Sequence, residues 1–249
     1  MNKPVVYDLF TGLHGWLEGF LAEDYRCVGY DIEDMCAVLG VSRPEGIEFR
    51  QRDIRSIHGS ELKDASVIVA SPPCQAYSYR AMPWKRAKAL PPPDNTLFNE
   101  CFRIQREAIE AAGHHIPLIV ENVRGAQKWV GRARWNYGSF YLWGDVPALM
   151  PMSLKIKTPG RSLDRNATAK WGPHNMGKGH LMMAEIAGIK QPGISGVRNN
   201  GKGDKWFQDG AARHGSKSNS RKAASAMIAK IPLPLSLHIA RTYKPVEDE

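Results

Sequence analysis

Short apolar runs alternate with longer amphipathic stretches through the first half of the chain. The runs predict strands at 4–9, 26–31, 47–50, 66–70 and 116–120, and the stretches at 15–23, 33–40 and 98–112 have the apolar spacing of helices. Residues 138–143 and the segment before them again predict β-structure. Alternation of this kind predicts an α/β fold in which helices cover both faces of a mostly parallel sheet.

The pattern changes from about Gly144. Glycine and proline then recur with poor apolar periodicity, which indicates a loop-rich insertion. Regular spacing returns at 220–229, where Ser220 is a suitable N-cap, and a last helix is expected from Pro234 through Ala240. The chain is therefore expected to divide into a sheet domain (1–144 with 222–249) and a small basic insertion (145–221).

Length and composition suit one large domain. The 249 residues are 43% hydrophobic, which supports a substantial core. No apolar run is long enough for a membrane helix, and no signal peptide fits before the first strand, so a cytoplasmic protein is expected. Four cysteines without C-x-x-C spacing argue against a metal site or a disulfide framework, and Cys27, Cys36 and Cys101 are expected to be buried.

The basic charge is concentrated in the insertion. Residues 145–221 contain 13 Lys/Arg against five Asp/Glu, so they carry +8 of the net charge of +9. Trp171, Trp206 and Phe207 lie among these charges. A solvated basic face is one interpretation, but the confinement of the charge to a stretch with glycines and aromatics favours a polyanion-binding surface.

One cysteine follows a predicted strand directly. The loop after 66–70 reads SPPCQ, and its two prolines restrict the backbone ahead of Cys74. Open α/β sheets place their chemistry at the ends of such strands. Cys74 therefore differs from the other cysteines and is a candidate nucleophile.

The first three predicted strands end in groups suited to a nucleoside cofactor. Gly12 and Gly15 allow a tight turn that leads into a helix N-terminus. Asp31 ends the second strand, where a carboxylate can accept from ribose hydroxyls, and Asp53-Ile54 ends the third, where both side chains can hold an adenine. Taken singly, either aspartate is as readily a cap at a strand end.

Later strands add further polar groups at the same expected edge. Glu121 follows the strand at 116–120, so it can face the loop of Cys74 across the ends of the strands. Arg132 and Arg134 alternate, and they share one face if their segment is a strand.

Together and in this order, these pieces resemble the DNA cytosine-5 methyltransferases, especially the short forms of phages and prophages. The matching segments are Asp8-Leu9-Phe10-x-Gly12, Asp31, Asp53-Ile54, Pro73-Cys74-Gln75 with Ser78, Leu97-Phe98-x-Glu100, Glu121-Asn122-Val123 and Arg132-x-Arg134. The resemblance covers roughly 1–144 and, more weakly, 222–242. Residues 145–221 stand where the family keeps its target-recognition domain.

The resemblance implies a Rossmann-like methyltransferase fold, S-adenosylmethionine as methyl donor, and a cytosine flipped out of DNA as acceptor. Cys74 would add covalently to the ring, Glu121 would share a proton with ring N3, and Arg134 with Arg132 would bond O2. The residues expected at the cofactor are Asp8, Phe10, Gly12, His14, Gly15, Asp31, Ile32, Asp53, Ile54 and Pro72. Those expected to contact DNA are Gln75, Ser78, Asn122, Arg198, Lys202, Lys205, Trp206, Arg213 and Lys217.

The chain departs from the family's pattern at three places. His14 stands where glycine is usual, Val130 where a glutamine usually precedes the arginine pair, and Ile228 to Pro232 where Gly-Asn-Ala-Val-Pro is usual. Two other functions stay open. One is a non-catalytic DNA-binding relative, which the intact Cys74 and Glu121 argue against. The other is an RNA cytosine-5 methyltransferase or a variant that transfers another group to C5, since phosphate contacts and base flipping would look alike.

Overall fold

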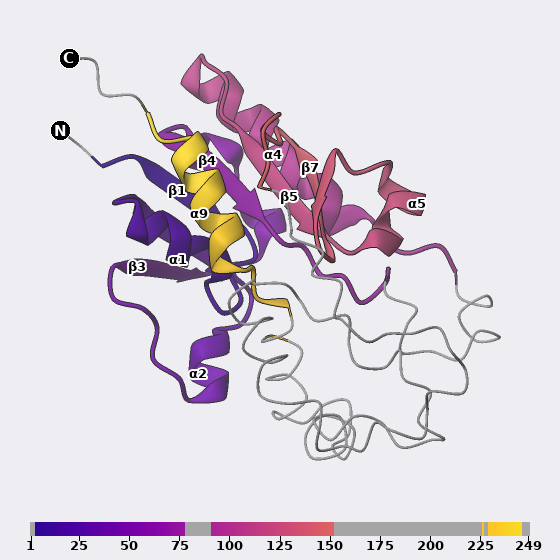
Figure 1. The fold of residues 1–249 in the computed structure, drawn as a ribbon, viewed down its shortest axis with the longest axis horizontal. Helices are drawn as coiled ribbons and strands as arrows, with labels where there is room; N and C mark the ends of the chain where they lie inside the picture. Colours follow the sequence, from indigo (N-terminus) through magenta and orange to yellow (C-terminus); the bar gives the residue numbers. More distant parts are fainter. Residues whose placement is uncertain (1–2, 78–90, 152–225, 227–228, 246–249) are drawn as a thin grey trace, which may run out of the picture.

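The computed structural model describes residues 3–77, 91–151, 226 and 229–245, and within them a seven-stranded sheet has the order β3-β2-β1-β4-β5-β7-β6 (Figure 1). Its strands are β1 (Val5–Asp8), β2 (Arg26–Asp31), β3 (Ile47–Gln51), β4 (Ala65–Ala70), β5 (Leu118–Asn122), β6 (Trp135–Tyr137) and β7 (Phe140–Gly144). Strands β1 to β5 pair in parallel, and β7 pairs antiparallel with both β5 and β6. The predicted α/β fold with a mostly parallel sheet is confirmed.

The helices also lie close to the predicted positions. They are α1 (Gly15–Ala22), α2 (Met35–Leu39), α4 (Thr96–Ala112), α5 (Gln127–Val130) and α9 (Leu233–Thr242), with short 3-10 turns η1 (Ile54–Ser56), η2 (Gly59–Leu62) and η4 (Arg124–Ala126). Most of the helix predicted at 220–229 lies outside the described residues. Among the helices of the described ranges, none combines the length and apolar composition needed to cross a bilayer.

Two apolar layers form on the two faces of the sheet. Alternate residues of a strand point to opposite faces, so Tyr7 of β1 packs into the cluster that includes Ile104 of α4. Its neighbour Val6 packs into the opposite cluster, with Leu17 of α1 and Leu235 of α9. Helix α4 therefore covers one face, and α1 and α9 lie together on the other (Figure 1).

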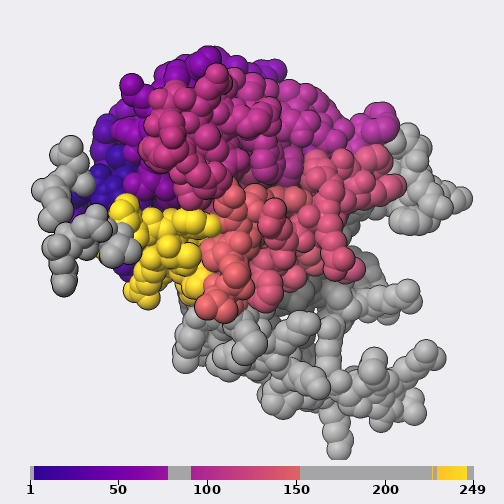
Figure 2. Space-filling model, turned by 90° about the horizontal axis from the view of Figure 1, so that it is seen from above, coloured from indigo at the N-terminus to yellow at the C-terminus, as the bar shows by residue number. Residues whose placement is uncertain are grey.

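The C-terminal helix returns the chain to its beginning. A Cβ on Gly19 of α1 would overlap Ser236 of α9, so only glycine allows the two helices to approach so closely. Figure 2 shows α9 beside the residues that follow β7, where the hydroxyl of Tyr243 donates to the carbonyl of Asp145. Val146 packs on the same core, so the first residues of the predicted insertion belong structurally to the sheet domain.

The strand order positions the functional site. From β1 the chain builds outward to β2 and β3, and then crosses to β4 on the other side of β1. The carboxyl ends of β1 and β4 therefore flank the point where the order reverses. In open α/β sheets, this is the crevice where ligands bind.

Candidate active site

The loop after β1 is bonded to the strands on both sides. The amide of Leu9 donates to the carbonyl of Val69 at 2.9 Å, and the amide of Thr11 donates to that of Tyr30 at 2.9 Å. Gly12 has φ of +48°, and a Cβ built on it meets nothing within 4 Å. The loop is therefore fixed in place while its glycine backbone stays open to a ligand.

Asp31 holds this loop from the end of β2. One carboxylate oxygen accepts from the amide of Gly12 at 3.0 Å, and the other accepts from the amide of Ile32 at 2.8 Å. Burial raises the pKa of Asp31 above its usual value. Because a carboxylate has about four acceptor positions, Asp31 can still accept from a ligand hydroxyl.

Asp8, the last residue of β1, is a buried acid. Its side chain is 1% exposed, and one oxygen accepts from the amide of Phe10 at 3.4 Å. The other oxygen has no hydrogen-bond partner among the described residues. Burial raises the pKa of Asp8 from 3.8 to about 8, so the carboxyl is largely protonated at neutral pH.

The backbone conformation at His14 is one that favours glycine, the residue usual at this position. It caps α1 in the left-handed region, with φ of 61°, where a side chain costs roughly 1–2 kcal/mol. The ring is buried, with Nδ1 2.9 Å from the hydroxyl of Thr11 and Nε2 without a partner among the described residues. Burial, helped by the charges of Arg43 and Lys230, lowers the pKa of His14 to about 4, so the imidazole is neutral.

The described part of the altered C-terminal segment packs against the start of α1. A Cβ on Gly15 would lie 2.5 Å from the amide nitrogen of Ile231, so only glycine fits there. The ammonium of Lys230 pairs with Glu18 of α1 at 2.5 Å. The segment therefore closes over the N-terminus of α1 although its sequence departs from the family's pattern.

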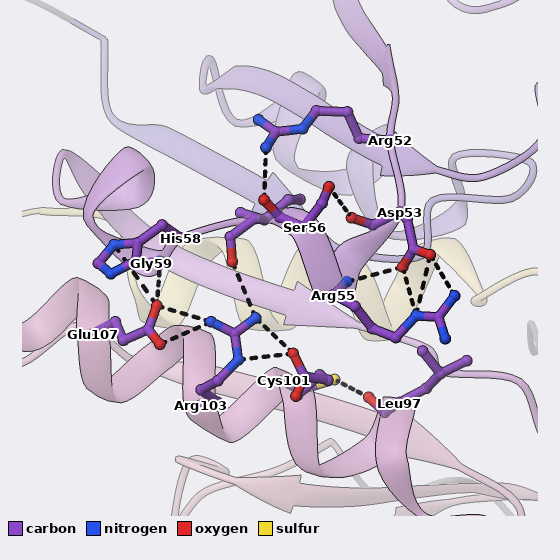
Figure 3. Close-up of polar contacts among 12 residues, drawn as sticks. Arg52, Asp53, Arg55, Ser56, His58, Gly59, Leu97, Cys101, Arg103 and Glu107 are labelled. Carbon is purple, nitrogen blue, oxygen red and sulfur yellow. Dashed lines mark hydrogen bonds and ion pairs between the residues drawn. The ribbon is translucent and has the colours of Figure 1, made fainter.

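Asp53 acts as a cap in this structure. Its side chain accepts from the amide of Arg55 at 2.9 Å and pairs with the same residue's guanidinium, beside the bonded pair Arg103 and Glu107 of α4 (Figure 3). Arg55 lowers the pKa of Asp53 to about 2. Capping was the alternative explanation for an aspartate here, and a contact between Asp53 and an adenine stays a prediction.

The two isoleucines expected at the cofactor differ in exposure. Ile54 is 3% exposed and belongs to the core under α4, whereas Ile32 is 66% exposed. An exposed isoleucine just past Asp31 offers a flat apolar surface to a ring. Of the two, Ile32 is therefore the better placed to touch one.

The loop of Cys74 is held by two neighbouring elements. The indole nitrogen of Trp16 in α1 donates to the hydroxyl of Ser71 at 3.0 Å. The amide of Asn122 at the end of β5 donates to the carbonyl of Pro72 at 2.9 Å. Cys74 itself is half-buried, so the thiol lies on a fixed loop.

Tyr77 fixes the far side of the same loop. Its amide donates to the carbonyl of Cys74 at 3.0 Å, and its hydroxyl donates to Asn95 at 2.8 Å. A Cβ on Gly125 would overlap the backbone of Tyr77. The supporting roles of Trp16 and Tyr77 are not predictable from the sequence, because their partners are distant along the chain.

Asn122 differs from its predicted role. It is 1% exposed, and its oxygen accepts from the amide of Val123 at 2.8 Å while its nitrogen bonds Pro72. Both polar atoms are therefore bonded to the protein. The structure indicates a support for the Cys74 loop, and a contact between Asn122 and DNA stays a prediction.

Glu121 lies at the same edge of the sheet as the thiol loop. Strand β5 runs to Asn122, two residues beyond the predicted end, so Glu121 lies within it and is 6% exposed. Ala70 of β4 is opposite Val120 of β5, which brings Glu121 level with the first residue after β4. This register is consistent with the prediction that the carboxyl of Glu121 faces the Cys74 loop.

Arg132 and Arg134 precede β6 and do not lie in a strand, so the premise for their sharing a strand face is wrong. Both nevertheless line one hollow of about 500 Å³, together with Arg124 of η4 and Tyr141 of β7. The amide of Arg134 donates to the carbonyl of Leu142 at 2.9 Å, which ties the segment to β7.

A glutamine reaches the arginine segment from an unexpected position. Val130 ends α5, but Gln127 at its start accepts from the amide of Ala133 at 3.2 Å. Gln127 also lines the hollow. The side chain missing at position 130 therefore has a counterpart one helical turn earlier.

The remaining predictions divide between buried cysteines and undescribed residues. Cys27, Cys36 and Cys101 are buried as predicted, and burial raises the pKa of each thiol. Gln75 is exposed beside Cys74. Seven predicted DNA contacts lie outside the described residues: Ser78, Arg198, Lys202, Lys205, Trp206, Arg213 and Lys217.

Comparison with known proteins decides the family. The model of the C-5 cytosine-specific DNA methylase family matches residues 5–131, just over half of the chain. The chain belongs to this family. The expected resemblance to DNA cytosine-5 methyltransferases is therefore confirmed, and the elements described above, from β1 to α5, are those of a C-5 cytosine methylase.

The chain is also similar to solved structures at low identity. A DNA modification methyltransferase encoded within an E. coli prophage is 18% identical, with 51% of this chain and 34% of that chain covered and a TM-score of 0.35. The S. pombe Dnmt2 methyltransferase is 16% identical, with 51% and 36% covered and a TM-score of 0.36. The chain thus spans little more than a third of these structures. None of the curated proteins matches it.

Proposed function

We propose that this chain transfers a methyl group from S-adenosylmethionine to C5 of cytosine in DNA. The observation that carries the proposal is the arrangement of the carboxyl edge, where the Cys74 loop after β4 lies between the glycine loop after β1 and Glu121 of β5. Thiol, carboxyl and cofactor loop thus follow three adjacent strands. Such adjacency suits a reaction in which a methyl donor and a base meet above one cysteine.

The residues around the β1 loop fit the methyl donor. Gly12 leaves open space beside its backbone, Asp31 has acceptor capacity for ribose hydroxyls, and Ile32 is exposed for a ring contact. Asp8 and His14 flank this loop, and each has a buried polar atom without a partner among the described residues, which a polar ligand can satisfy. When bound, S-adenosylmethionine supplies an electrophilic methyl group on a sulfonium.

Cys74 activates the base. Cytosine C5 is a poor nucleophile, so the thiolate of Cys74 adds to C6, and the electron pair of the C5–C6 double bond becomes available at C5. After methyl transfer, loss of the C5 proton and departure of the thiolate restore the ring and the enzyme. The bonds from Trp16 and Asn122 keep the loop in one position during both steps.

Glu121 and the arginines act on the polar edge of the ring. Glu121 shares a proton with N3, which offsets the negative charge that develops when the thiolate adds. Arg134, with Arg132, donates to O2 and orients the ring. The basic segment 145–221 holds phosphates while the cytosine is flipped out of the duplex.

The proposal is tested by labelled-methyl incorporation into duplex DNA, single-stranded DNA and tRNA. Label is expected in DNA, and Cys74→Ser should lose at least about 10³-fold in rate, since a hydroxyl is a far weaker nucleophile than a thiolate. Cys36→Ala is the matched control, because Cys36 is a buried cysteine in α2, and it should keep the parent rate. A covalent complex with DNA containing 5-fluorocytosine should form with the parent and not with Cys74→Ser.

Other outcomes would identify the alternatives. Label in tRNA alone would indicate an RNA cytosine-5 methyltransferase. DNA binding without label in any substrate would indicate a non-catalytic relative. A near-parent rate for Cys74→Ser would rule out the covalent mechanism.

A further inference from the structure

The arginines of the described residues fall into two groups. Seven form ion pairs with carboxylates: Arg26, Arg43, Arg50, Arg52, Arg55, Arg103 and Arg241. The other four, Arg106, Arg124, Arg132 and Arg134, have no carboxylate partner within the described ranges. Three of these four line the same hollow. Among the described arginines, those without a carboxylate partner are therefore concentrated mainly at one place.

Two aromatic residues also contribute to the lining of the hollow. Trp135 and Tyr141 line it beside the arginines, and Trp135 is 39% exposed. Three guanidinium groups around one space repel one another, and an anion placed between them removes that cost. An exposed indole beside arginines is typical of sites where a nucleotide base stacks.

The strand register relates the hollow to the proposed reaction site. Trp135 of β6 is opposite Leu142 of β7, and Leu142 is opposite Glu121 of β5. Trp135 is therefore level with Glu121 and two strands away, which is roughly 10 Å at the usual strand spacing. One or two nucleotides of a strand bridge such a distance.

We propose that the hollow is a nucleotide subsite, in which Arg124 binds a phosphate of the target strand and Trp135 stacks on the base next to the target cytosine. This inference rests on the proposed function for the identity of the strand, and it adds Arg124 and Trp135 to the binding residues. Guanidinium groups bind phosphate oxygens in a bidentate manner, which suits Arg124 at the exposed end of η4. The stacked base then limits how far the strand can shift past Glu121.

Binding measurements separate the phosphate from the base contact without any methyl transfer. The probes are a fluorescent oligothymidylate of about 12 nucleotides and an abasic oligomer of equal length. Arg124→Gln should weaken both about tenfold and reduce the log–log salt slope by about 0.7, the value for one single-strand phosphate contact. Arg106→Gln is the matched control, because Arg106 is an exposed, equally unpaired arginine on α4, and it should leave affinity and slope unchanged.

The base contact is measured as a preference for thymidylate over the abasic oligomer. Trp135→Ala should reduce this preference about tenfold, with little change in the salt slope, and Trp135→Phe should retain most of it. In methyl transfer, Arg124→Gln should raise the KM for DNA and leave kcat near the parent value, since the residue does not touch the reacting atoms.

Several results would overturn the subsite. Arg124→Gln behaving like Arg106→Gln would exclude the phosphate contact, and an unchanged preference in Trp135→Ala would exclude stacking. Displacement of the oligonucleotide by polyglutamate at equal charge concentration would indicate a site for acidic peptides. These assays measure binding alone. If the Arg124 and Trp135 variants bind oligonucleotides as expected but the protein transfers no methyl group, the subsite stands and the proposed function is contradicted. If the protein transfers methyl groups but these variants bind like the parent, the proposed function stands and the subsite is contradicted.

Discussion

At the edge of the sheet where the parallel strands end, the charged side chains of the two halves differ in burial and pairing. On the cofactor half, after β1, β2 and β3, Asp8 is buried, Asp31 is bonded to backbone amides, and Asp53 is paired with Arg55. On the DNA half, Arg124 follows β5 and lines one hollow together with Arg134, and both are exposed, with no carboxylate partner among the described residues.

The difference reflects the size and charge of the ligands we propose. A small molecule gains most from groups that are already fixed, because little order is lost on binding. A polyanion instead supplies the missing charge itself, and unpaired arginines attract it from a distance. The Cys74 loop lies between the halves and is bonded to both of them, through Trp16 on the cofactor side and Asn122 on the other.

The largest expected effect concerns the buried acid of the cofactor half. Burial raises the pKa of Asp8 from 3.8 to about 8, so the folded protein binds a proton that the unfolded chain releases. Stability relative to Asp8→Asn should therefore be fully present below about pH 4 and fall by on the order of a few kcal/mol as the pH rises to about 8. Urea unfolding of both proteins over this range measures the difference.

Asp24→Asn is the control for that titration. Asp24 is an exposed carboxyl paired with Lys3, and this partner lowers its pKa. Relative to Asp24→Asn, the parent protein should therefore lose no stability as the pH rises. Parallel stability curves for the parent and Asp8→Asn would mean that Asp8 is not a buried acid in solution, and the contrast between the halves would weaken.

The next effect tests the bond between the thiol loop and β5. Asn122→Ala leaves the carbonyl of Pro72 without its donor, so the loop should shift. A displacement of about 1 Å at a reacting group can lower the rate about 100-fold. We expect a loss of this size in methyl transfer with the affinity for S-adenosylmethionine unchanged. Asn99→Ala, at an exposed position of α4, should keep the parent rate, and a full rate in Asn122→Ala would exclude the supporting role.

The smallest effect sharpens the comparison between ligands. Asp31→Ala should weaken S-adenosylmethionine binding by about 1–3 kcal/mol, because it removes an acceptor for ribose and releases the amide of Gly12. Asp53→Ala should weaken it less, since Asp53 is already paired with Arg55. Calorimetry measures both affinities. Neither variant should change the affinity for an oligonucleotide. If either variant weakens the binding of S-adenosylmethionine and of the oligonucleotide equally, the two halves are not separate sites.

Several parts of the site are readable from the sequence because they are local. The apolar runs predicted the strands, since a buried strand must be apolar over four to six residues whatever surrounds it. The parallel order then brings strand ends to one edge, so Cys74, Glu121 and Asp31 were expected there. The departure at His14 was also visible, although its cost depends on a backbone φ of 61° that only the structure provides.

Only the tertiary structure determined which side chains support the chemistry and which remain without a partner. Trp16, Tyr77 and Gln127 act through hydrogen bonds to residues that no sequence pattern links to them. The gathering of three arginines that have no carboxylate partner among the described residues also arises only when the chain has folded. The sequence by itself determined the elements and the residue types at their ends, because these depend on local hydrophobicity and chain direction. Burial and the proposed nucleotide subsite depend on how separate elements pack together, and that packing exists only once the sheet has formed.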